Sequence, residues 1–469
     1  MEKPVKRRDI VDLKIEDLSF HGKGVAKMDN YTIFVDDGIP GQKVTAKIKK
    51  AKKSYAEAYI KEVLEKSDYE IDAPCKYFDY CGGCKHQNIP YEIQLAFFRK
   101  QITDLYQRLG GFTDVEINPV VGAEKIFHYR NKMEFSFSRH RWLTGEFEQD
   151  KPQDFALGLR VQGNYWKSID LDDCLIAPKE SARIMALVRE FCLENNLKAY
   201  DQREHVGFLR HLMIRKGYNT GQLLVNIVTQ ENRPELFEPL KDRILAEFPG
   251  ITSLMHTVAT NKGGTTIPEI QNILYGREYI EDRLGDLTYK ISSASFFQTN
   301  TIMAEKLYSE IQQAANVQPD ENVWDLYCGT GSIGLFLAPG AKTVTGIEII
   351  KAAVHDAVNN AKNNNIDNIE FLNGNLDSLF DKQPELFKQL PHPDLLIVDP
   401  PRSGLHPKLV EQIIQINPGR IVYVSCNPAT QVRDLKILNE KGGYTITSVQ
   451  AVDMFPHTPH IEVVTGLRQ

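Results

Sequence analysis

The sequence lacks any long apolar run and any strong excess of one charge. No stretch approaches the ~18 consecutive apolar residues of a membrane-spanning helix. The basic start, MEKPVKRRDI, has no apolar segment behind it that would make a secretion signal. The net charge is −6 over 469 residues, and 25% of the residues are charged, as in ordinary globular proteins. We therefore expect a cytoplasmic, monomeric protein of two or three domains that does not enter a membrane.

Cysteine is also scarce. The chain has seven cysteines, and an odd number in a long sequence is a poor basis for a disulfide framework. Metal binding or catalysis is the better explanation for those that stand in patterns.

The charge is unevenly distributed. Residues 1–66 hold fifteen Lys and Arg against eleven Asp and Glu, and six lysines lie between Lys43 and Lys53 with no acid among them. The same segment reads as five short strands separated by turns: DIVDLKI, GKGVAKM, YTIFVDD, QKVTAKI and AYIKEVL. This pattern predicts a small OB-like β-barrel over 1–66, a fold that commonly binds oligonucleotides. The lysines are either a phosphate-binding surface or a solvated loop.

The rest of the chain divides into two parts by its predicted secondary structure. Residues 67–290 are mostly strand-like, for example FALGLRV and the hairpin HLMIRKGYNTGQLLVNIVT, with a helix near 180–195. From about 291 to 469, strands alternate with helices, which predicts a doubly wound, Rossmann-like α/β domain. A further helix is expected at about 91–110, ended by Gly110-Gly111, and we expect it to pack on this last domain.

A glycine-rich turn stands at the first strand of the α/β region. In NVWDLYCGTGSIGLFLA, Gly329, Gly331 and Gly334 follow an apolar strand and open a helix. Glu348, nineteen residues past Gly329, ends the next strand and can accept hydrogen bonds from ribose hydroxyls. This pattern suits S-adenosylmethionine and NAD equally well, so the turn alone does not choose the cofactor.

Two later strands carry polar motifs at their carboxyl ends, the edge where open α/β sheets bind ligands. PDLLIVDPPRSG runs into Asp399, and RIVYVSCNP runs into Cys426. Hydride transfer has no use for a cysteine there, whereas methylation of an unreactive carbon does. A thiolate added to carbon 6 of uracil makes carbon 5 nucleophilic, and a base must later remove the carbon 5 proton. Cys426 is the candidate nucleophile, with Arg402 a candidate neighbour, and Glu462 is the candidate base.

A second group of cysteines lies in a short segment with two glycines. Three thiols within ten residues favour an iron–sulfur cluster or zinc: Cys75, Cys81 and Cys84. A fourth ligand is needed. Cys328 lies in the glycine turn and Cys192 on an amphipathic helix, so Cys174 is the remaining choice. The spacing differs from that of radical S-adenosylmethionine enzymes.

The stretches DPPRSG, IVYVSCNPAT sixteen residues later, and VDMFPHTPHIE resemble the signatures of the RNA uracil-5-methyltransferase family. The resemblance covers essentially the whole chain and implies that Cys426 is the nucleophile and Glu462 the proton acceptor. It also implies S-adenosylmethionine as methyl donor, held by four residues: Gln298, Tyr327, Glu348 and Asp399.

The same resemblance makes the N-terminal barrel similar to the TRAM domain. It implies a [4Fe-4S] cluster on the four cysteines of the central domain. Because bacterial transfer-RNA members generally lack both features, the resemblance points to 23S ribosomal RNA, with transfer RNA as an alternative. The target uridine is expected in a loop or flipped out.

Two competing functions remain. A noncatalytic RNA-binding or chaperone protein could retain the fold, but it would need neither the Cys426 and Glu462 pair nor the intact glycine turn. Methylation of an exocyclic nitrogen would use the Asp-Pro-Pro turn, yet such enzymes usually follow it with an aromatic residue and do not need the cysteine.

Overall fold

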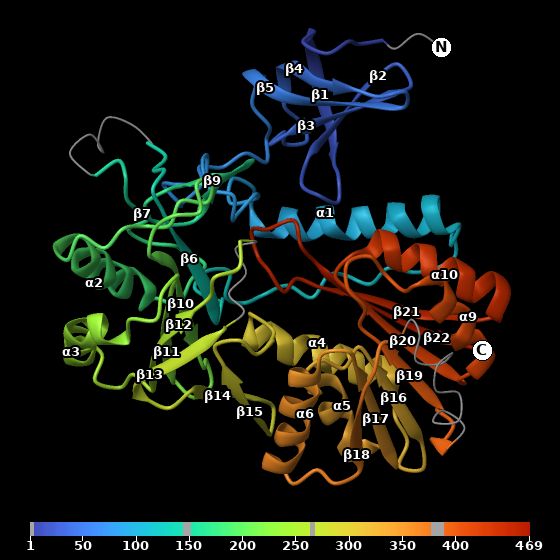
Figure 1. Cartoon of the computed structure of the whole chain (residues 1–469). Helices are drawn as coiled ribbons and strands as arrows, with labels where there is room; N and C mark the ends of the chain where they lie inside the picture. The colour runs from blue at the N-terminus through green and yellow to red at the C-terminus, as the bar shows by residue number, and fades with distance from the viewer. Residues whose placement is uncertain (1–3, 144–151, 263–267, 377–388) are drawn as a thin grey trace.

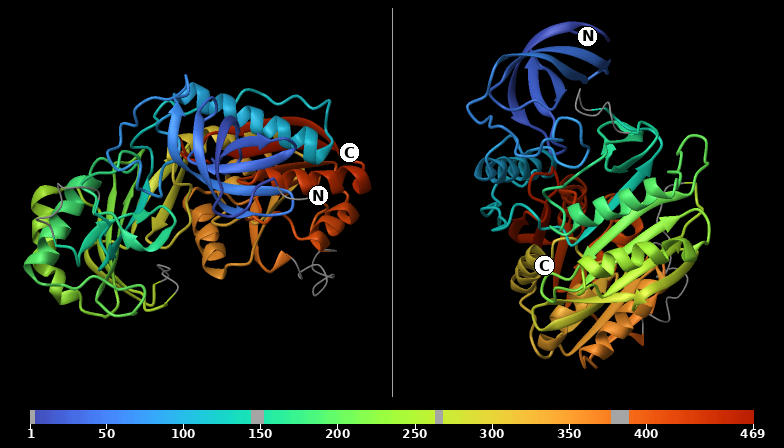
Figure 2. Two further views of the ribbon diagram at one scale, coloured as in Figure 1. Left: turned by 90° about the horizontal axis from the view of Figure 1, so that it is seen from above. Right: turned by 90° about the vertical axis from the view of Figure 1, so that its left-hand side faces the viewer.

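The structure of the protein is a computed structural model that describes residues 4–143, 152–262, 268–376 and 389–469. The chain forms three lobes, and the N-terminal barrel projects from the other two (Figures 1 and 2). A helix, α1 (Tyr91–Asp104), lies between the barrel and the C-terminal α/β lobe (Figure 1). Within the described ranges, no helix is both long enough and apolar enough to cross a membrane.

The first lobe is a closed five-stranded barrel in which neighbouring strands follow the order β1-β2-β3-β5-β4. Side chains alternate between buried and half-buried along β3, so every second side chain of this strand points into the barrel. The expected OB-like barrel is confirmed. Its strands are β1 (Ile10–Leu18), β2 (Gly24–Met28), β3 (Tyr31–Asp36), β4 (Lys43–Ala51) and β5 (Tyr55–Glu65).

The central lobe is built on a six-stranded sheet of order β13-β12-β11-β10-β6-β7. Helices α2 (Ser181–Glu194) and α3 (Glu238–Glu247) share its main apolar core. The sheet strands are β6 (Lys132–Ser138), β7 (Ala156–Gly158), β10 (Leu209–Lys216), β11 (Leu223–Thr229), β12 (Ser253–Val258) and β13 (Ile270–Gly276).

The strand-like segment FALGLRV is divided between two sheets. Residues of β7 pair with β6, whereas β8 (Arg160–Val161) pairs with β9 (Asn164–Ser168) in a separate small hairpin. The chain changes its pairing partner after Gly158. The hairpin in turn meets the cysteine segment through a bridge between Cys81 and Val161.

The C-terminal lobe contains a seven-stranded sheet of order β18-β17-β16-β19-β20-β22-β21. The five strands from β18 to β20 are parallel, and β22 is antiparallel to both of its neighbours. Buried apolar clusters lie on both faces of the sheet, which confirms the doubly wound α/β fold. The strands are β16 (Asn322–Leu326), β17 (Thr343–Glu348), β18 (Ile369–Asn373), β19 (Leu395–Val398), β20 (Arg420–Ser425), β21 (Thr445–Val452) and β22 (Glu462–Arg468).

Helices cover both faces of this sheet. One face packs with a hairpin that precedes the lobe in sequence, β14 (Tyr279–Leu284) and β15 (Leu287–Ser292), and with α4 (Thr301–Ala315), α5 (Ser332–Leu337) and α6 (Lys351–Asn363). The other face packs with α9 (Pro407–Ile416), α10 (Pro428–Gly442) and α1. Part of this core therefore comes from residues before 291.

Helix α1 continues as a π-helix over Leu105–Gly110, a change of winding that the sequence pattern did not predict. In the wider turns, the buried Tyr106 hydroxyl lies 2.6 Å from the Thr465 hydroxyl of β22. Gly111 then ends the helix in a left-handed conformation with φ of 78°. The expected helix stop at Gly110-Gly111 matches this end.

Candidate active site

A tight glycine turn joins β16 to α5 at the carboxyl edge of the sheet. Tyr327, Gly329 and Gly331 all have positive φ, of 63°, 56° and 79°. A β-carbon on Gly331 would lie 2.7 Å from the Phe371 ring, so only glycine fits there. At Gly329, in contrast, nothing lies within 4 Å of the β-carbon position. The turn therefore leaves room for a ligand beside its backbone.

Glu348, at the end of β17, is bound to this turn by its carboxylate. One oxygen accepts the Gly329 N–H at 3.1 Å and the other accepts the Ile350 N–H at 2.8 Å. The next two side chains, Ile349 and Ile350, are 56% and 60% exposed, although isoleucine is usually buried. A fixed carboxylate beside exposed apolar side chains can bind ribose hydroxyls and the face of an adenine ring.

Asp399 and Gln298, the other two residues expected to hold the cofactor, lie on different elements. Asp399 follows β19, the neighbour of β16, and burial raises its pKa to about 7. Gln298 precedes α4, and its carbonyl accepts an N–H from Asn131 of the central lobe at 2.7 Å. Asn300, two residues on, donates to the Met454 carbonyl at 3.0 Å in the segment that leads to Glu462.

Cys426 and Glu462 lie at the ends of two paired strands. The antiparallel pairing of β20 with β22 ends at Ser425 opposite Val463. Cys426 is the next residue after β20, and Glu462 is the first residue of β22. Because β22 runs antiparallel, its first residue lies at the edge where the parallel strands end. Cys426 is partly exposed and Glu462 is 7% exposed, so a ligand can reach the thiol beside a sheltered carboxyl.

Arg402, in the Asp-Pro-Pro-Arg turn, lowers the pKa of both Cys426 and Glu462. Burial raises the pKa of the Cys426 thiol to about 11, and the carboxylates of Glu462 and Asp399 add to that rise, while Arg402 lowers the pKa. Burial also raises the pKa of Glu462 well above its usual range, with Asp399 adding to the rise and Arg402 opposing it. Arg402 thus stabilises both the thiolate and the carboxylate.

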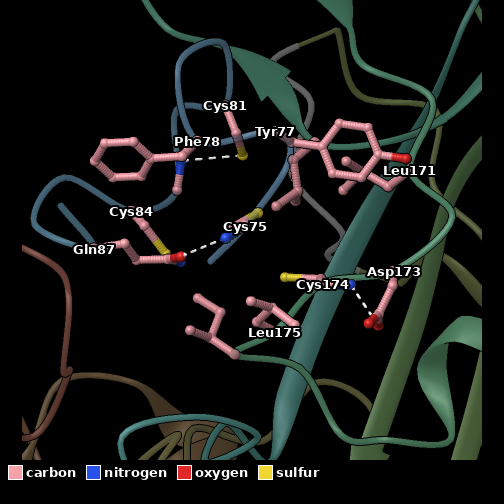
Figure 3. A pocket seen from close by; sticks show the side chains of 13 residues that line it. Cys75, Tyr77, Phe78, Cys81, Cys84, Gln87, Leu171, Asp173, Cys174 and Leu175 are labelled. Atoms are coloured by element: carbon pink, nitrogen blue, oxygen red, sulfur yellow. Dashed lines mark hydrogen bonds between the residues drawn. The ribbon is translucent and has the colours of Figure 1, made fainter. Parts of the chain in front are cut away.

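A second site is formed by cysteines of the central lobe. Cys75, Cys81, Cys84 and Cys174 line one pocket, and their sulfur atoms face one another (Figure 3). Burial raises the pKa of all four thiols, most for Cys174, to about 12. Across the described ranges, no group of three or more His, Cys, Asp or Glu side chains has the arrangement needed to hold a single metal ion.

The cysteine segment is hydrogen-bonded to the loop before Glu462. The His457 carbonyl accepts the N–H groups of Lys85 and His86 at 2.8 and 3.1 Å. The amide of Gln94, on α1, donates to the carbonyls of His86 and Ile89 and lies 3.2 Å from the His457 ring. These residues are about 360 positions apart in sequence, so no local pattern could have indicated that they position the loop.

Comparisons with known proteins agree with this architecture. Residues 4–61 match the TRAM domain, and residues 266–469 match the tRNA (uracil-5-)-methyltransferase family. An RNA methyltransferase of Chlorobaculum tepidum, itself uncharacterized, is 41% identical over 98% of this chain and 96% of its own length. A similar one of Halalkalibacterium halodurans is 37% identical over 99% and 98%.

A solved structure is similar over the same extent. It is the Pyrococcus abyssi tRNA (uracil-54, C5)-methyltransferase, solved in complex with S-adenosyl-L-homocysteine. Its sequence is 30% identical to this chain. It covers 97% of this chain and 100% of its own, with a TM-score of 0.76. The chain belongs to the RNA uracil-5-methyltransferase family. It is an RNA methyltransferase that uses S-adenosylmethionine, which confirms the resemblance seen in the sequence.

In this methyltransferase, the residues expected from the sequence gather at two places. Tyr327 and Asp399 follow β16 and β19, and Glu348 ends β17, the other neighbour of β16. Cys426 follows β20 and Glu462 begins β22, the next two strands along the same edge. Cys174 lies with the three clustered cysteines, whereas Cys192 is buried on α2 and Cys328 in the glycine turn.

Replacing Arg402 should make the Cys426 thiol less acidic. In Arg402→Gln, the charge that lowers the Cys426 pKa is lost, so the pKa rises and less thiolate is present at any pH below it. We expect alkylation of Cys426 by iodoacetamide at pH 8.5 to slow by about three- to tenfold, since one pKa unit changes the thiolate fraction about tenfold. Mass spectrometry of the Cys426 peptide measures the rate.

The matched control is Arg402→Lys, which keeps a positive charge and should stay near the wild-type rate. Equal rates in wild type and Arg402→Gln would show that Arg402 does not act on this thiol.

Proposed function

We propose that this enzyme methylates carbon 5 of uridine through a covalent bond between Cys426 and carbon 6. The observation that carries the proposal is the antiparallel pairing of β20 with β22, because Cys426 follows the one strand and Glu462 begins the other at the edge that holds the glycine turn. A noncatalytic RNA-binding protein would have no need of this pairing. We further propose that Gln298, Tyr327, Glu348 and Asp399 hold S-adenosylmethionine.

The steps follow from the chemistry of the ring. The Cys426 thiolate adds to carbon 6, and the electron pair of the carbon 5–carbon 6 bond moves to carbon 5 as an enolate. S-adenosylmethionine supplies the electrophilic methyl group that carbon 5 takes up. The Glu462 carboxylate then removes the carbon 5 proton, the ring double bond re-forms and the thiolate leaves. The raised pKa of Glu462 makes its carboxylate a stronger base for this proton.

RNA that carries 5-fluorouridine should trap the enzyme. Fluorine replaces the proton that the base removes, so elimination cannot occur and the protein stays attached to the RNA. We expect a denaturation-resistant band on gels with wild-type enzyme and S-adenosylmethionine, and no band with Cys426→Ala. Glu462→Gln should trap the adduct on ordinary RNA, because the carbon 5 proton then remains.

Cys192→Ala is the matched control, since Cys192 is a buried thiol on α2 of the central lobe, outside both the active site and the cysteine pocket. A band with Cys426→Ala as strong as with wild type would contradict the covalent mechanism. Running 23S ribosomal RNA fragments and transfer RNA in parallel identifies the substrate.

We propose 23S ribosomal RNA as that substrate, in a cytoplasmic monomer. The support is the combination of a TRAM barrel with the cysteine group, which bacterial transfer-RNA members generally lack, and the bacterial origin of the similar RNA methyltransferases. Transfer RNA is the second candidate, because the P. abyssi enzyme of similar structure is a tRNA methyltransferase.

We propose that the barrel, residues 1–66, binds RNA backbone through its unpaired lysines. Several of the clustered lysines are neutralised by ion pairs, such as Lys43 with Glu65 and Lys49 with Asp36. Lys52 and Lys53 are exposed at the β4–β5 turn and have no ion pair within the described residues. These two are therefore the better candidates for phosphate contacts.

Lys52→Gln/Lys53→Gln should weaken RNA binding and leave S-adenosylmethionine binding unchanged. Two lost phosphate contacts lower the slope of log affinity against log salt by about 1.4 to 1.8. Filter binding at several salt concentrations measures the slope, and calorimetry measures the cofactor. Lys43→Gln is the matched control, because its charge is already paired. Equal loss of both affinities would contradict the division of labour between the lobes.

We propose that Cys75, Cys81, Cys84 and Cys174 hold a [4Fe-4S] cluster with a structural or RNA-positioning role. Four soft thiol ligands around one pocket suit iron–sulfur chemistry. Structural zinc, which four thiolates can also bind, is the alternative. The bonds from Lys85 and His86 to His457 connect this segment to the loop before Glu462.

Anaerobically purified protein should contain about four iron and four sulfide per chain. Cys75→Ser or Cys174→Ser should lose most of the iron and lower the melting temperature, whereas Cys192→Ala, a buried cysteine outside the pocket, should keep it. Elemental analysis and visible absorption measure the content. Zinc in place of iron would contradict the proposed cluster. Normal RNA binding and methylation by iron-free protein would contradict its structural or RNA-positioning role.

A further inference from the structure

A second pocket on the central lobe combines tryptophan with unpaired positive charge. It has a volume of about 580 Å³, within the range of small-ligand sites. Trp142 follows β6, Trp166 lies on β9, and Arg203 lies in the turn before β10. Two of the three tryptophans in the chain therefore line one pocket.

The charge of this pocket is positive. Arg139, Lys167 and Arg203 line it, and none of the three has a carboxylate partner in the part of the chain that the structure describes. The nearby acids are already engaged below the surface. Asp201 lies 3.0 Å from the His140 ring, and Asp170 pairs with Arg141 and Arg189 at 3.3 and 3.1 Å. Among the described residues that line the pocket there are three unpaired cations and no acid, which favours an anionic ligand.

The cations lie over the faces of the tryptophan rings. The Lys167 ammonium is 5.1 Å from the Trp142 ring and 4.9 Å from the Trp166 ring, and the Arg203 guanidinium is 5.1 Å from Trp166. The His140 ring meets Trp166 edge to face at 4.9 Å. Tryptophan rings with cations beside them can stack with a base and bind its phosphate, which are the two parts of a nucleotide.

The β8–β9 hairpin, which carries Trp166 and Lys167 into the pocket, also contacts the barrel. Gln162, at the tip of this hairpin, donates to the Asp37 carboxylate of the barrel at 3.1 Å. The carbonyl of Arg160 in the same hairpin accepts the Gly82 N–H of the cysteine segment at 3.1 Å. The hairpin therefore connects the element that lines the pocket with the RNA-binding barrel.

We propose that this pocket binds an unpaired nucleotide of the substrate RNA outside the target uridine. When the base stacks on Trp166, Lys167 and Arg203 move from the ring to the phosphates, which Arg139 also contacts. An acidic peptide would draw the same cations away from the ring without covering the indole, whereas a nucleotide does both. The proposal rests on the RNA substrate of the family and not on the Cys426 mechanism, so Cys426→Ala should keep this binding.

A single-stranded oligoadenylate of ten nucleotides is the probe. Its binding to the full-length protein should quench tryptophan fluorescence, because Trp324 is buried in the C-terminal lobe and only Trp142 and Trp166 can stack with it. Trp166→Ala should weaken binding about 5- to 100-fold, the range expected for loss of one stacked base. Trp166→Phe keeps a ring and should stay within about threefold of wild type.

Tyr279→Ala is the matched control, since Tyr279 also carries two cations over its ring, Arg277 and Lys290, but lies on β14. Circular dichroism and S-adenosylmethionine affinity report folding for every variant. Wild-type affinity in Trp166→Ala, equal losses in the Ala and Phe variants, or displacement of the oligonucleotide by polyglutamate at equal charge would each overturn the proposal.

Discussion

The antiparallel pairing of β22 with β20 is the contact on which the arrangement of the site depends. The parallel strands alone bring Tyr327, Glu348 and Asp399 to one edge of the sheet, because all their carboxyl ends meet there. Glu462 reaches this edge in a different way, at the start of a strand and not after its end. Because β22 runs against β20, its first residue, Glu462, lies at the edge where β20 ends and Cys426 follows.

The other lobes support this register from outside the sheet. Tyr106 reaches β22 from the π-helix, and Gln94 reaches the loop before Glu462 from α1. Asn300 and Tyr129 bind further carbonyls of that loop, at Met454 and Pro456. The segment from 453 to 461 is therefore held by hydrogen bonds from several elements, which fixes where Glu462 enters the sheet.

The fold and the family could be predicted from the sequence, because strand ends and turn residues are local signals. The barrel, the α/β fold and the family are confirmed, since apolar strands, glycine turns and long motifs lie in contiguous stretches. The contacts between distant segments could not be read. The ion pairs of Lys43 and Lys49, the division of FALGLRV between two sheets and the contact of Tyr106 with Thr465 all depend on partners in other strands. The roles of the individual site residues remain predictions.

The topology of the sheet also governs how the enzyme acquires its activity. Strand β22 lies between β20 and β21 although it follows both in sequence, so β20 lacks its second partner and β21 lacks its strand partner until β22 inserts. Until then two strand edges are open to mispairing, a hazard for which cells employ chaperones. Glu462 arrives with that same strand. A chain in which this step is incomplete therefore carries the Cys426 thiol without the Glu462 carboxyl near it.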